Sequence, residues 1–416
     1  MAASRRAAAA QVAARHHDQS ASEALVRYAE AYFGDRSIFV RPIEPYEGLE
    51  SATARVAGLA GDDLLVTDLA GSDSTMSAER SADTDHEALL VFHTSGSTGS
   101  PSCVIYTKQT ARAHARAIAS ALELDAGISY VALPPPRFAY GLSIVDSHLE
   151  ADVPVTFIDA DWTLPGLSAV AEASDDDIAI YALPQHTPLL TSSTIDPQRV
   201  TRLFIAGGRI SEGSVRRLAE HFPRLRLTNM YGQAEMGPRL SIWDGDPADF
   251  VEGSIGAPLQ GVSLRVQNPD DTAPSRIVAA SEFSMWKVLK PPYTQIADGP
   301  GTGEIVTSDL ATMSPDGTLR HGGRADHVLN VAGTKVDLRR LQEIVTQAAK
   351  PVIVRIGSKP SKVAGDDIPV IEIVPGPETP ARTGPIRRAL HDEFGRLAGL
   401  FDINYVQQLS LKESGK

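Results

Sequence analysis

The stretch His93-Thr-Ser-Gly-Ser-Thr-Gly-Ser-Pro-Ser102 constrains this chain most. Apolar runs flank it at Ala88–Phe92 and Cys103–Tyr106, which read as two buried strands. Glycines allow the backbone N–H groups to turn inward, and the hydroxyls add donors, so the stretch predicts a phosphate-binding loop. Its spacing is not that of a Walker loop, and a flexible Ser/Gly turn is the alternative. The residues expected to contact phosphate are Thr94, Ser95, Gly96, Ser97, Thr98 and Gly99.

Length and composition limit the number of domains and the class of protein. The chain has 416 residues, enough for two or three domains, and its 42% hydrophobic and 22% charged residues are typical of a soluble globular protein. A formal net charge of −13 argues against a nucleic-acid groove. No apolar run approaches membrane-spanning length, and Met1–Arg15 lacks the apolar middle of a secretory signal. We therefore expect a cytoplasmic protein that binds neither nucleic acid nor membrane.

The single cysteine, Cys103, excludes an intrachain disulfide, and no Cys/His cluster has the spacing of zinc ligands. Beside the loop and at the start of an apolar run, Cys103 is expected to be a small buried side chain.

Between Glu87 and about Tyr231, short β-rich runs alternate with helical segments, which predicts a mainly parallel sheet covered by helices. Sheets of this kind bind ligands beyond the carboxyl ends of their strands. The hydroxyl-rich loop and the Gly207-Gly208 pair each follow a strand, so we expect both to face one crevice. The strands are expected at Ser129–Leu133, Pro154–Ile158, Ile178–Ala182 and Arg202–Ile205, and the helices at Thr110–Leu124, Leu142–Ala151, Leu167–Ala173 and Ser211–His221.

The flanking regions differ from this core. Ser20–Phe33 reads as a helix, and residues 43–87 are acidic with one clear strand, Leu64–Thr67. After Pro238, alternating strands separated by Pro/Gly/Asp turns predict an antiparallel, barrel-like subdomain. Val328–Lys416 reads as a small α+β module, with helices expected at Leu338–Ala349 and Thr383–Leu397. The predicted class is therefore α/β in three parts: a shortened N-terminal arm and approach to the core over 1–86, a core domain over 87–325, and a C-terminal domain over 326–416.

Five further motifs follow the loop. In this order and at this spacing, they and the loop resemble the adenylate-forming superfamily, which includes acyl- and aryl-CoA synthetases, peptide-synthetase adenylation domains and firefly luciferase. The resemblance runs from about Glu87 to the last residue. The five motifs are Phe138-Ala-Tyr-Gly141, Ile205-Ala-Gly-Gly208, Asn229-Met-Tyr-Gly-Gln-Ala-Glu235, Thr307-Ser-Asp309, and Gly323-Arg-Ala-Asp326 with Val331-Ala-Gly-Thr-Lys-Val336.

The resemblance implies a two-step reaction. A carboxylate attacks the α-phosphate of ATP to give an acyl adenylate and pyrophosphate, and a second nucleophile then displaces AMP. It implies that the loop holds the β- and γ-phosphates and that Glu235 binds the Mg²⁺ that bridges phosphate oxygens. The remaining nucleotide-binding residues that it implies are Gly207, Gly208, Asn229, Tyr231, Gly232 and Asp309, with Tyr231 against adenine and Asp309 on the ribose hydroxyls.

The C-terminal domain resembles the mobile lid of that superfamily, which closes one way for adenylation and swings for the second step. Asp326 matches the hinge. Arg324 would be a cationic donor near the nucleotide, and Lys416 the catalytic lysine that reaches the α-phosphate, with Lys412 as the alternative.

Each of these residues can also have an ordinary structural role instead of a role in the site. A Gly-Gly pair can be a turn, Tyr231 can be core packing, and Glu235 can be a charge at a helix end. Asp309 can be a helix N-cap, the stem of Arg324 can cover apolar surface, and Lys416 can belong to a basic tail.

Three positions depart from the superfamily pattern. Ser102 stands where a lysine usually follows the loop, Ala234 replaces a phosphate-contacting threonine, and Arg340 occupies a usual glutamate position. Lys108 is the nearest substitute cation in sequence. Loss of one charged phosphate contact is expected to cost about 1.5–3 kcal/mol, which slows adenylation without forbidding it. The superfamily also carries more chain before the loop, so we expect a partner subunit or a second copy to cover the shortened side.

The acid pocket is expected to include Phe138, Ala139, Tyr140, Gly141 and Leu183. These residues would make an apolar, partly aromatic pocket, which favours an aryl or medium acyl acid over an amino acid. His186 or Arg239 would contact the substrate or, more simply, support the pocket from behind. We predict an ATP- and Mg²⁺-dependent acid ligase whose acceptor is a thiol of coenzyme A or of a carrier protein, with an amine acceptor or a non-catalytic binding subunit as the alternatives.

Overall fold

The computed structural model describes residues 19–41, 48–60, 64–76, 88–94, 101–158, 175–269, 273–314, 317–325, 328–331, 334–349, 353–360, 367–374 and 383–406. The chain divides into two units. Unit 1 comprises Met1–Asp270, Val278–Val306 and Thr312–His321, and unit 2 comprises Asp271–Ile277, Thr307–Ala311 and Gly322–Lys416. The predicted boundary between residues 325 and 326 stays a prediction.

Sheet A, the first large sheet of unit 1, has seven strands in the order β16-β15-β5-β4-β1-β2-β3. β1 runs parallel to β2 and to β4, and the other neighbouring pairs are antiparallel. The strands are β16 (Ile296–Asp298), β15 (Lys287–Leu289), β5 (Cys103–Thr107), β4 (Leu89–His93), β1 (Ser37–Val40), β2 (Leu64–Thr67) and β3 (Asp73–Met76).

The N-terminal stretch contains more structure than we expected. It supplies three strands of sheet A and helix α3 (Leu49–Ala60), where the sequence indicated one strand. The strands are four residues each, and the buried face of α3 is Ala52, Val56, Ala57 and Ala60. Because alanines carry little hydrophobic signal, periodicity alone does not reveal this helix.

Sheet B has the order β12-β11-β10-β9-β8-β6-β7. The run from β10 to β7 is parallel, which confirms the predicted parallel sheet, and β11 and β12 add antiparallel strands. The strands are β12 (Ala257–Pro258), β11 (Gly237–Gly245), β10 (Arg226–Gln233), β9 (Val200–Ile205), β8 (Ile178–Ala182), β6 (Ser129–Ala132) and β7 (Thr156–Phe157).

The hydroxyl-rich loop joins β4 to β5, an antiparallel pair in sheet A, whereas Gly207 follows β9 of sheet B. The expectation that both follow strands of one parallel sheet is therefore wrong. The alternation of strands and helices suggested a single parallel sheet, but β4 and β5 are joined by the hydroxyl-rich loop and pair with each other in antiparallel fashion.

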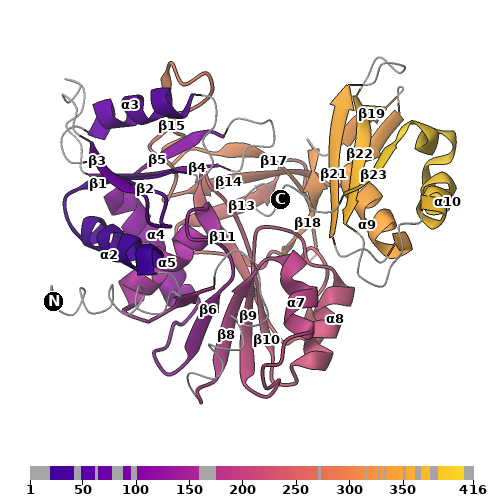
Figure 1. Cartoon of the computed structure of the whole chain (residues 1–416), viewed down its shortest axis with the longest axis horizontal. Helices are drawn as coiled ribbons and strands as arrows, with labels where there is room; N and C mark the ends of the chain where they lie inside the picture. Colours follow the sequence, from indigo (N-terminus) through magenta and orange to yellow (C-terminus); the bar gives the residue numbers. More distant parts are fainter. Residues whose placement is uncertain are drawn as a thin grey trace. The chain divides into compact units, whose positions relative to one another are not determined.

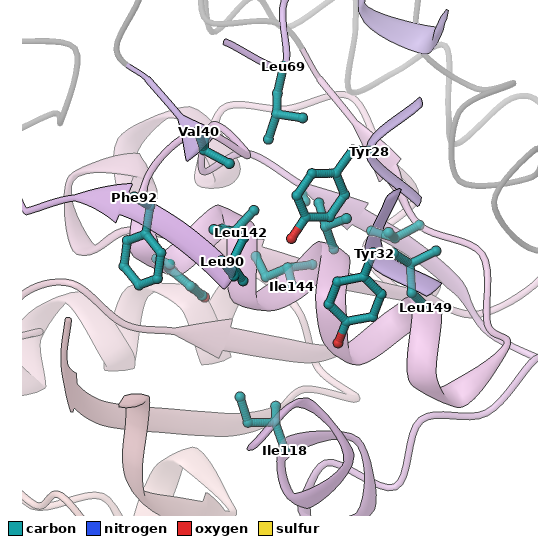
Figure 2. Close-up of a cluster of buried hydrophobic side chains, with 14 of the residues drawn as sticks. Tyr28, Tyr32, Val40, Leu69, Leu90, Phe92, Ile118, Leu142, Ile144 and Leu149 are labelled. Carbon is teal, nitrogen blue, oxygen red and sulfur yellow. The ribbon is translucent and has the colours of Figure 1, made fainter. Parts of the chain in front are cut away.

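Helices separate the two sheets in layers (Figure 1). Helices α2 (Gln19–Phe33), α4 (Lys108–Ala121) and α5 (Ala139–Ala151) contribute to one core with residues of both sheets. Helix α3 packs on the other face of sheet A, and α7 (Thr187–Thr191) and α8 (Glu212–His221) pack on the other face of sheet B. Figure 2 shows part of the middle core, with Tyr28 and Tyr32 from α2, Leu90 from β4 and Leu142 from α5.

Local sequence explains where these helices begin and end. Thr107 caps α4 by accepting a hydrogen bond from the N–H of Thr110, and Ser211 caps α8 through the N–H of Ser214. Asp152 ends α5 in the left-handed conformation, with φ of 58°. The helix expected at Leu167–Ala173 lies outside the described residues. Short 3₁₀ turns follow at Pro184–His186 and Pro247–Asp249.

A third sheet contains β13 (Val262–Val266), β14 (Ser275–Ser281), β17 (Ile305–Met313) and β18 (Leu319–Arg324), in that order. It occupies the region where the barrel-like subdomain was predicted. The division into two units passes through its strands.

Unit 2 also holds an antiparallel hairpin and a three-stranded sheet around its own core. The predicted helix at Leu338–Ala349 is observed with the same bounds. The elements are β19 (Val328–Val331), β20 (Thr334–Asp337), α9 (Leu338–Ala349), β21 (Ile353–Pro360), β22 (Asp367–Val374), α10 (Thr383–Phe394), a 3₁₀ helix (Gly395–Leu400) and β23 (Asp402–Tyr405). The predicted α/β class is confirmed. Within the described residues, no helix is both long and apolar enough to cross a membrane.

Candidate active site

The two ends of the hydroxyl-rich loop are held together. The N–H of Thr94 donates to the carbonyl of Ser102 (2.8 Å), and the N–H of Ser102 donates to the Thr94 hydroxyl (3.2 Å). The Tyr293 hydroxyl donates to the carbonyl of Pro101 (2.6 Å). Thr94 therefore holds the two ends of the loop together through its hydrogen bonds with Ser102. The other predicted phosphate-binding residues, Ser95, Gly96, Ser97, Thr98 and Gly99, lie outside the described residues.

A buried histidine and cysteine lie at the base of the loop. His93 Nδ1 is 3.2 Å from the carbonyl of Val40 and so carries the ring proton, which leaves Nε2 to accept from Cys103 Sγ at 3.4 Å. Burial lowers the pKa of His93 to about 4, so the ring is neutral. Cys103 is buried, as expected.

Lys108 does not replace the missing loop cation. Its Nζ donates to the backbone carbonyls of Ala31, Gly34 and Arg36, at the end of helix α2. It follows the far end of β5, and a strand of that length separates it from the loop by about 15 Å. Burial lowers its pKa to about 8. The sequence expectation for Lys108 is wrong because nearness in sequence along a strand is not nearness in space.

The turn between β10 and β11 carries the motif that ends at Glu235. The pairing register shifts between Tyr231 and Gln233, which places Gly232 at a β-bulge. A Cβ on Gly232 would lie 2.1 Å from the carbonyl oxygen of Pro238, so another residue here would force the two strands apart. The glycine of the motif thus sets the shape of the turn that carries Glu235.

Tyr106 of β5 fastens this turn to sheet A. Its hydroxyl donates to the carbonyl of Ala234 (2.5 Å) and accepts from the N–H of Gly237 (3.0 Å). The N–H of Met285 donates to the carbonyl of Glu235 (3.0 Å). Burial raises the pKa of Tyr106, and the nearby Glu235 raises it further. The motif turn is therefore fixed to the strand that leaves the loop. No sequence pattern indicated this role for Tyr106, which reads as part of an apolar run.

Asn229 and Tyr231 stand on β10, leading into the turn. The Asn229 side chain donates from Nδ2 to the carbonyl of Ser254 (2.8 Å), and its buried Oδ1 has no hydrogen-bond partner among the described residues. Tyr231 is buried, with its ring centroid 5.9 Å from that of His321, and its hydroxyl accepts from Gln233 (3.2 Å). A buried acceptor without a partner is the kind of atom that a ligand donor satisfies.

Gly207 lies against the predicted acid pocket. Its φ is +79°, in the left-handed region, and a Cβ there would lie 2.7 Å from Leu183 and 4.0 Å from Tyr140. Gly208 is more open, since a Cβ would meet Pro184 at 3.3 Å. The structure thus brings together Gly207, Leu183 and Tyr140, which the sequence assigned to the nucleotide site and to the acid pocket.

The Tyr140 side chain is buried and packed against its neighbours. Its hydroxyl donates to the carbonyl of Phe204 (2.9 Å), and the Arg239 guanidinium lies 4.0 Å from its ring centroid. Arg239 is buried, donates to the carbonyl of Pro238 (2.5 Å), and forms no ion pair with the described carboxylates. Burial lowers its pKa to about 10, so it stays charged. Arg239 is a packed cation rather than a surface residue.

Gly141 and His186 have structural roles of the same kind. A Cβ on Gly141 would lie 2.0 Å from the carbonyl oxygen of Pro135. His186 Nδ1 accepts from the N–H of Leu183 (3.2 Å), and burial lowers the pKa of His186 to about 3. Phe138, at the start of α5, is half-buried with Arg137 5.2 Å over its ring.

A cavity opens beside Ala139, on the other side of α5. It is small, about 20 Å³, which is room for one or two water molecules. Pro238, three residues after Glu235, and Tyr106 border it. The lining residues are Leu90, Phe92, Tyr106, Ala111, His114, Ala115, Ile118, Ala139, Leu142, Ser143, Asp146 and Pro238.

In unit 2, Asp309 and Arg324 are brought together. Arg324 Nη1 lies 3.4 Å from Asp309 Oδ1, and the Asp309 side chain is 7% exposed while that of Arg324 is 33% exposed. The N–H of Asp309 donates to the Thr307 hydroxyl (3.1 Å). Asp309 lies within β17, so the helix N-cap alternative does not apply.

The other predicted C-terminal residues divide into two groups. Asp326, Lys412 and Lys416 lie outside the described residues. Arg340 is exposed and forms ion pairs with Glu393 (3.1 Å) and Glu343 (3.4 Å). The positive charge of Arg340 is therefore paired with these two glutamates on the surface of unit 2.

Comparison with known proteins gives the same family as these motifs. The family model described as AMP-binding enzyme matches residues 21–278. An indigoidine synthase of Dickeya dadantii (strain 3937) is 24% identical over 312 residues, which are 62% of this chain and 19% of that protein. The chain therefore spans about a fifth of that relative's length.

Solved structures of similar fold cover nearly the whole chain. An o-succinylbenzoate coenzyme A synthetase from Bacillus subtilis, in complex with AMP, has a TM-score of 0.66 at 14% identity and covers 99% of this chain and 91% of that one. An amide bond synthetase from Marinactinospora thermotolerans has a TM-score of 0.65 at 16% identity and covers 98% and 92%. The AMP-binding enzyme model matches more than half of this chain, and the chain therefore belongs to the AMP-binding enzyme family of adenylate-forming ligases.

Proposed function

We propose that this chain is an ATP- and Mg²⁺-dependent acid ligase that forms an acyl or aryl adenylate and passes the acyl group to a thiol. One observation carries the proposal: Tyr106 ties the turn before Glu235 to β5, the strand that leaves the hydroxyl-rich loop. The turn that carries Glu235, the proposed metal ligand, is thereby fixed to the strand that begins at the predicted phosphate loop, with Tyr106 about 13 Å along it.

The residues present fit a nucleotide. The buried Asn229 Oδ1, which has no hydrogen-bond partner among the described residues, is an acceptor suited to the amino group of adenine. Gly207 would let the backbone approach the base, which is the role that the motif implies. Asp309, supported by Arg324, would accept the two ribose hydroxyls. Tyr231 would pack against the base.

A single carboxylate at Glu235 suits Mg²⁺, which proteins hold through one or two carboxylates plus substrate phosphates. The ion would neutralise charge on the phosphates during attack by the carboxylate. Loop residues Thr94 to Gly99 would orient the leaving pyrophosphate, and Lys416 would contact the α-phosphate. Asp326 would be the hinge of the lid.

The acceptor is proposed as coenzyme A or a carrier-protein thiol, with the reaction in the cytoplasm. The similar structures include a coenzyme A synthetase and an amide bond synthetase, whose names imply two acceptor chemistries, a thiol and an amine. Supplying a preformed acyl adenylate with coenzyme A, a pantetheine-bearing carrier protein or an amine, and measuring AMP release, would identify the acceptor.

The test of the first half-reaction is carboxylate-dependent ATP–pyrophosphate exchange over a panel of aryl, fatty and amino acids. Exchange with one acid class supports the ligase. Silence across the panel, with ATP binding still measurable by calorimetry, would favour the non-catalytic subunit that Ser102 and Ala234 suggest. Glu235→Gln should raise the Mg²⁺ concentration needed for half-maximal exchange at least about tenfold, and an unchanged magnesium titration would remove Glu235 from the site.

A second copy or a partner subunit on the N-terminal side stays part of the proposal. Helices cover both faces of sheet A in the described residues, so a partner would meet the strand edge or the helices rather than a bare face. Light scattering at micromolar concentration tests it, and a monomer would contradict it.

A further inference from the structure

Arg41 follows strand β1 at the edge of sheet A from which the hydroxyl-rich loop leaves. β1 runs parallel to β4, and their pairing places Phe39 opposite Val91. Two residues further along both strands, Arg41 stands level with His93, the residue before Thr94. Because neighbouring strands lie about 4.8 Å apart, the backbone of Arg41 is close to the first residue of the loop.

The order of the strands places Arg41 and Ser102 on the two sides of the loop base. β4 lies between β1 and β5 in sheet A, and Ser102 directly precedes β5. The N–H of Thr94 donates to the Ser102 carbonyl (2.8 Å). Arg41 is thus two strand spacings, roughly 10 Å, from the position at which the superfamily pattern has a lysine. A long side chain from either position can reach an ion at the end of β4.

Arg41 also starts on the face of sheet A on which the loop is anchored. Successive side chains of a strand point to opposite faces, so Arg41 shares a face with Phe39. Phe39 belongs to the core beneath α3, and its ring centroid lies 5.1 Å from that of His93. Tyr293, a member of the same core, donates from its hydroxyl to the carbonyl of Pro101 at the far end of the loop (2.6 Å).

The guanidinium of Arg41 lacks a full set of partners. Its Nε is buried and has no hydrogen-bond partner among the described residues. On the other side of β1, the N–H of Arg41 donates to the Thr67 carbonyl (2.9 Å). The carboxylate that follows, Asp68, is turned to its own loop, where its Oδ1 accepts from the N–H groups of Ala70 (2.9 Å) and Ser72 (3.0 Å). A buried donor without a partner is destabilising, and a bound oxyanion would remove that cost.

Two other cations of this sheet stand at its opposite edge. Arg36 precedes β1 and donates from Nη2 to the Thr75 hydroxyl (2.9 Å). Lys108 follows β5, which runs antiparallel to β4, and donates to backbone carbonyls there, including that of Arg36 (3.0 Å). Of these three cations, only Arg41 stands at the edge that carries the loop.

We propose that Arg41 binds the terminal phosphates of ATP and takes the place of the loop lysine that Ser102 replaces. This inference rests on the proposed function for the identity of the ligand. A guanidinium suits this task because its planar fork donates two parallel N–H bonds to phosphate oxygens and stays charged. Arg41 would hold the same phosphates when they leave as pyrophosphate, so pyrophosphate itself probes the site.

The test is calorimetric binding of pyrophosphate, with Mg²⁺ present, to the wild type and to variants of Arg41. Arg41→Met should weaken binding at least about tenfold, and Arg41→Lys, which keeps the charge, should weaken it less. Arg36→Met removes the same charge from the other end of β1 and should bind pyrophosphate as the wild type does. In exchange, Arg41→Met should raise the KM for pyrophosphate and leave the KM for the acid unchanged. Equal losses of affinity in Arg41→Met and Arg36→Met would overturn the proposal.

The second background tests whether Arg41 replaces the loop lysine. Ser102→Lys restores the cation of the superfamily pattern, so Arg41→Met should lose less pyrophosphate affinity in this background than in the wild type. The same loss in both backgrounds would mean that the two positions serve different phosphates, which would overturn the replacement.

Phenylglyoxal labelling of the wild type decides the matter even if Arg41→Met does not fold. The reagent modifies guanidinium groups, and mass spectrometry of the digested protein locates the label. Pyrophosphate should protect Arg41 and leave the labelling of Arg36 unchanged. Labelling of Arg41 that is the same with and without pyrophosphate would contradict the proposal.

The outcomes separate the two proposals. Exchange that proceeds while Arg41→Met binds pyrophosphate as tightly as the wild type would overturn the role of Arg41 and leave the ligase standing. A wild type that is silent in exchange but binds pyrophosphate through Arg41 would support the role of Arg41 and count against the ligase. A wild type that binds neither pyrophosphate nor ATP would overturn both.

Discussion

Helix α5 has two faces that this protein uses in opposite ways. On one face Tyr140 and His148 are packed against sheet B: the Tyr140 hydroxyl donates to Phe204, and His148 Nε2 accepts from the Tyr181 hydroxyl (2.9 Å). On the other face Ala139 and Asp146 border a cavity. Ten of the helix's residues are buried, so hydrophobicity alone does not distinguish the faces.

The difference comes from the partners. The closed face meets aromatic rings and the Arg239 guanidinium, which fill the space, whereas α4 offers Ala111 and Ala115 to the open face. Small side chains on a facing helix leave a gap that the neighbouring side chains do not fill. One helix can therefore be tightly packed on one side and border a cavity on the other.

The strongest test of the closed face is Gly141→Ala. A Cβ at this position would lie 2.0 Å from a backbone oxygen of the preceding loop, which cannot move without shifting α5. We expect a loss of more than about 4 kcal/mol in the free energy of unfolding, or failure to fold, measured by urea denaturation. Gly58→Ala in helix α3 is the matched control, since nothing lies within 4 Å of its Cβ, and it should stabilise by about 0.5–1 kcal/mol.

Arg239 tests whether the closed face is held by its buried cation. Arg239→Ala removes the contact with Tyr140 and leaves a void, so we expect a loss of about 3 kcal/mol in the free energy of unfolding. Arg239→Met fills most of the volume without charge and should lose less, because a buried charge without a carboxylate costs desolvation. If the two variants lost equal stability, the void would not be the cause.

The two faces should also respond to pH with opposite sign. Burial lowers the pKa of His148 to about 4, so the folded state resists its protonation, and this stability is lost as pH falls from the ordinary histidine pKa toward about 4. Burial raises the pKa of Asp146 to about 8, so its contribution is present at acid pH and is lost progressively as pH rises from the ordinary carboxyl pKa to about 8.

Urea unfolding at about pH 5 and about pH 7 measures both slopes. His148→Gln should remove about 2 kcal/mol of the decline toward acid, and Asp146→Asn should remove about 3 kcal/mol of the decline toward neutral pH. Variants that left both slopes unchanged would mean that these side chains titrate in the folded protein as they do in the unfolded chain.

Much of this could be predicted from sequence. Alternating runs predicted the parallel sheet and its helices, and six motifs in order predicted the family. What failed depended on side chains from distant parts of the chain. The acid pocket around Tyr140 stays a prediction, but no sequence pattern indicated that Arg239, far along the chain, packs over the Tyr140 ring.

Lys108 failed for a related reason. It is close to the loop in sequence, but β5 carries it to the end of α2, where its charge is used by backbone carbonyls. Asp146 gave no signal, because an acidic residue within a helix usually faces solvent. Pairings of this kind are set by tertiary contacts, which periodicity does not encode.

The smallest expected effect belongs to Tyr106, at the end of the open face nearest Glu235. Tyr106→Phe keeps the ring that lines the cavity but removes the hydroxyl that joins Ala234 to Gly237. We expect a loss of about 1–2 kcal/mol in the free energy of unfolding and a higher Mg²⁺ requirement in exchange, because the Glu235 turn is released from β5. Tyr130→Phe, which removes a hydroxyl that accepts from the N–H of Asp125 (3.1 Å), should lose comparable stability without changing the magnesium titration. If both variants shifted the magnesium requirement equally, the effect would come from general loosening of unit 1, and the link from β5 to Glu235 would not position the metal carboxylate.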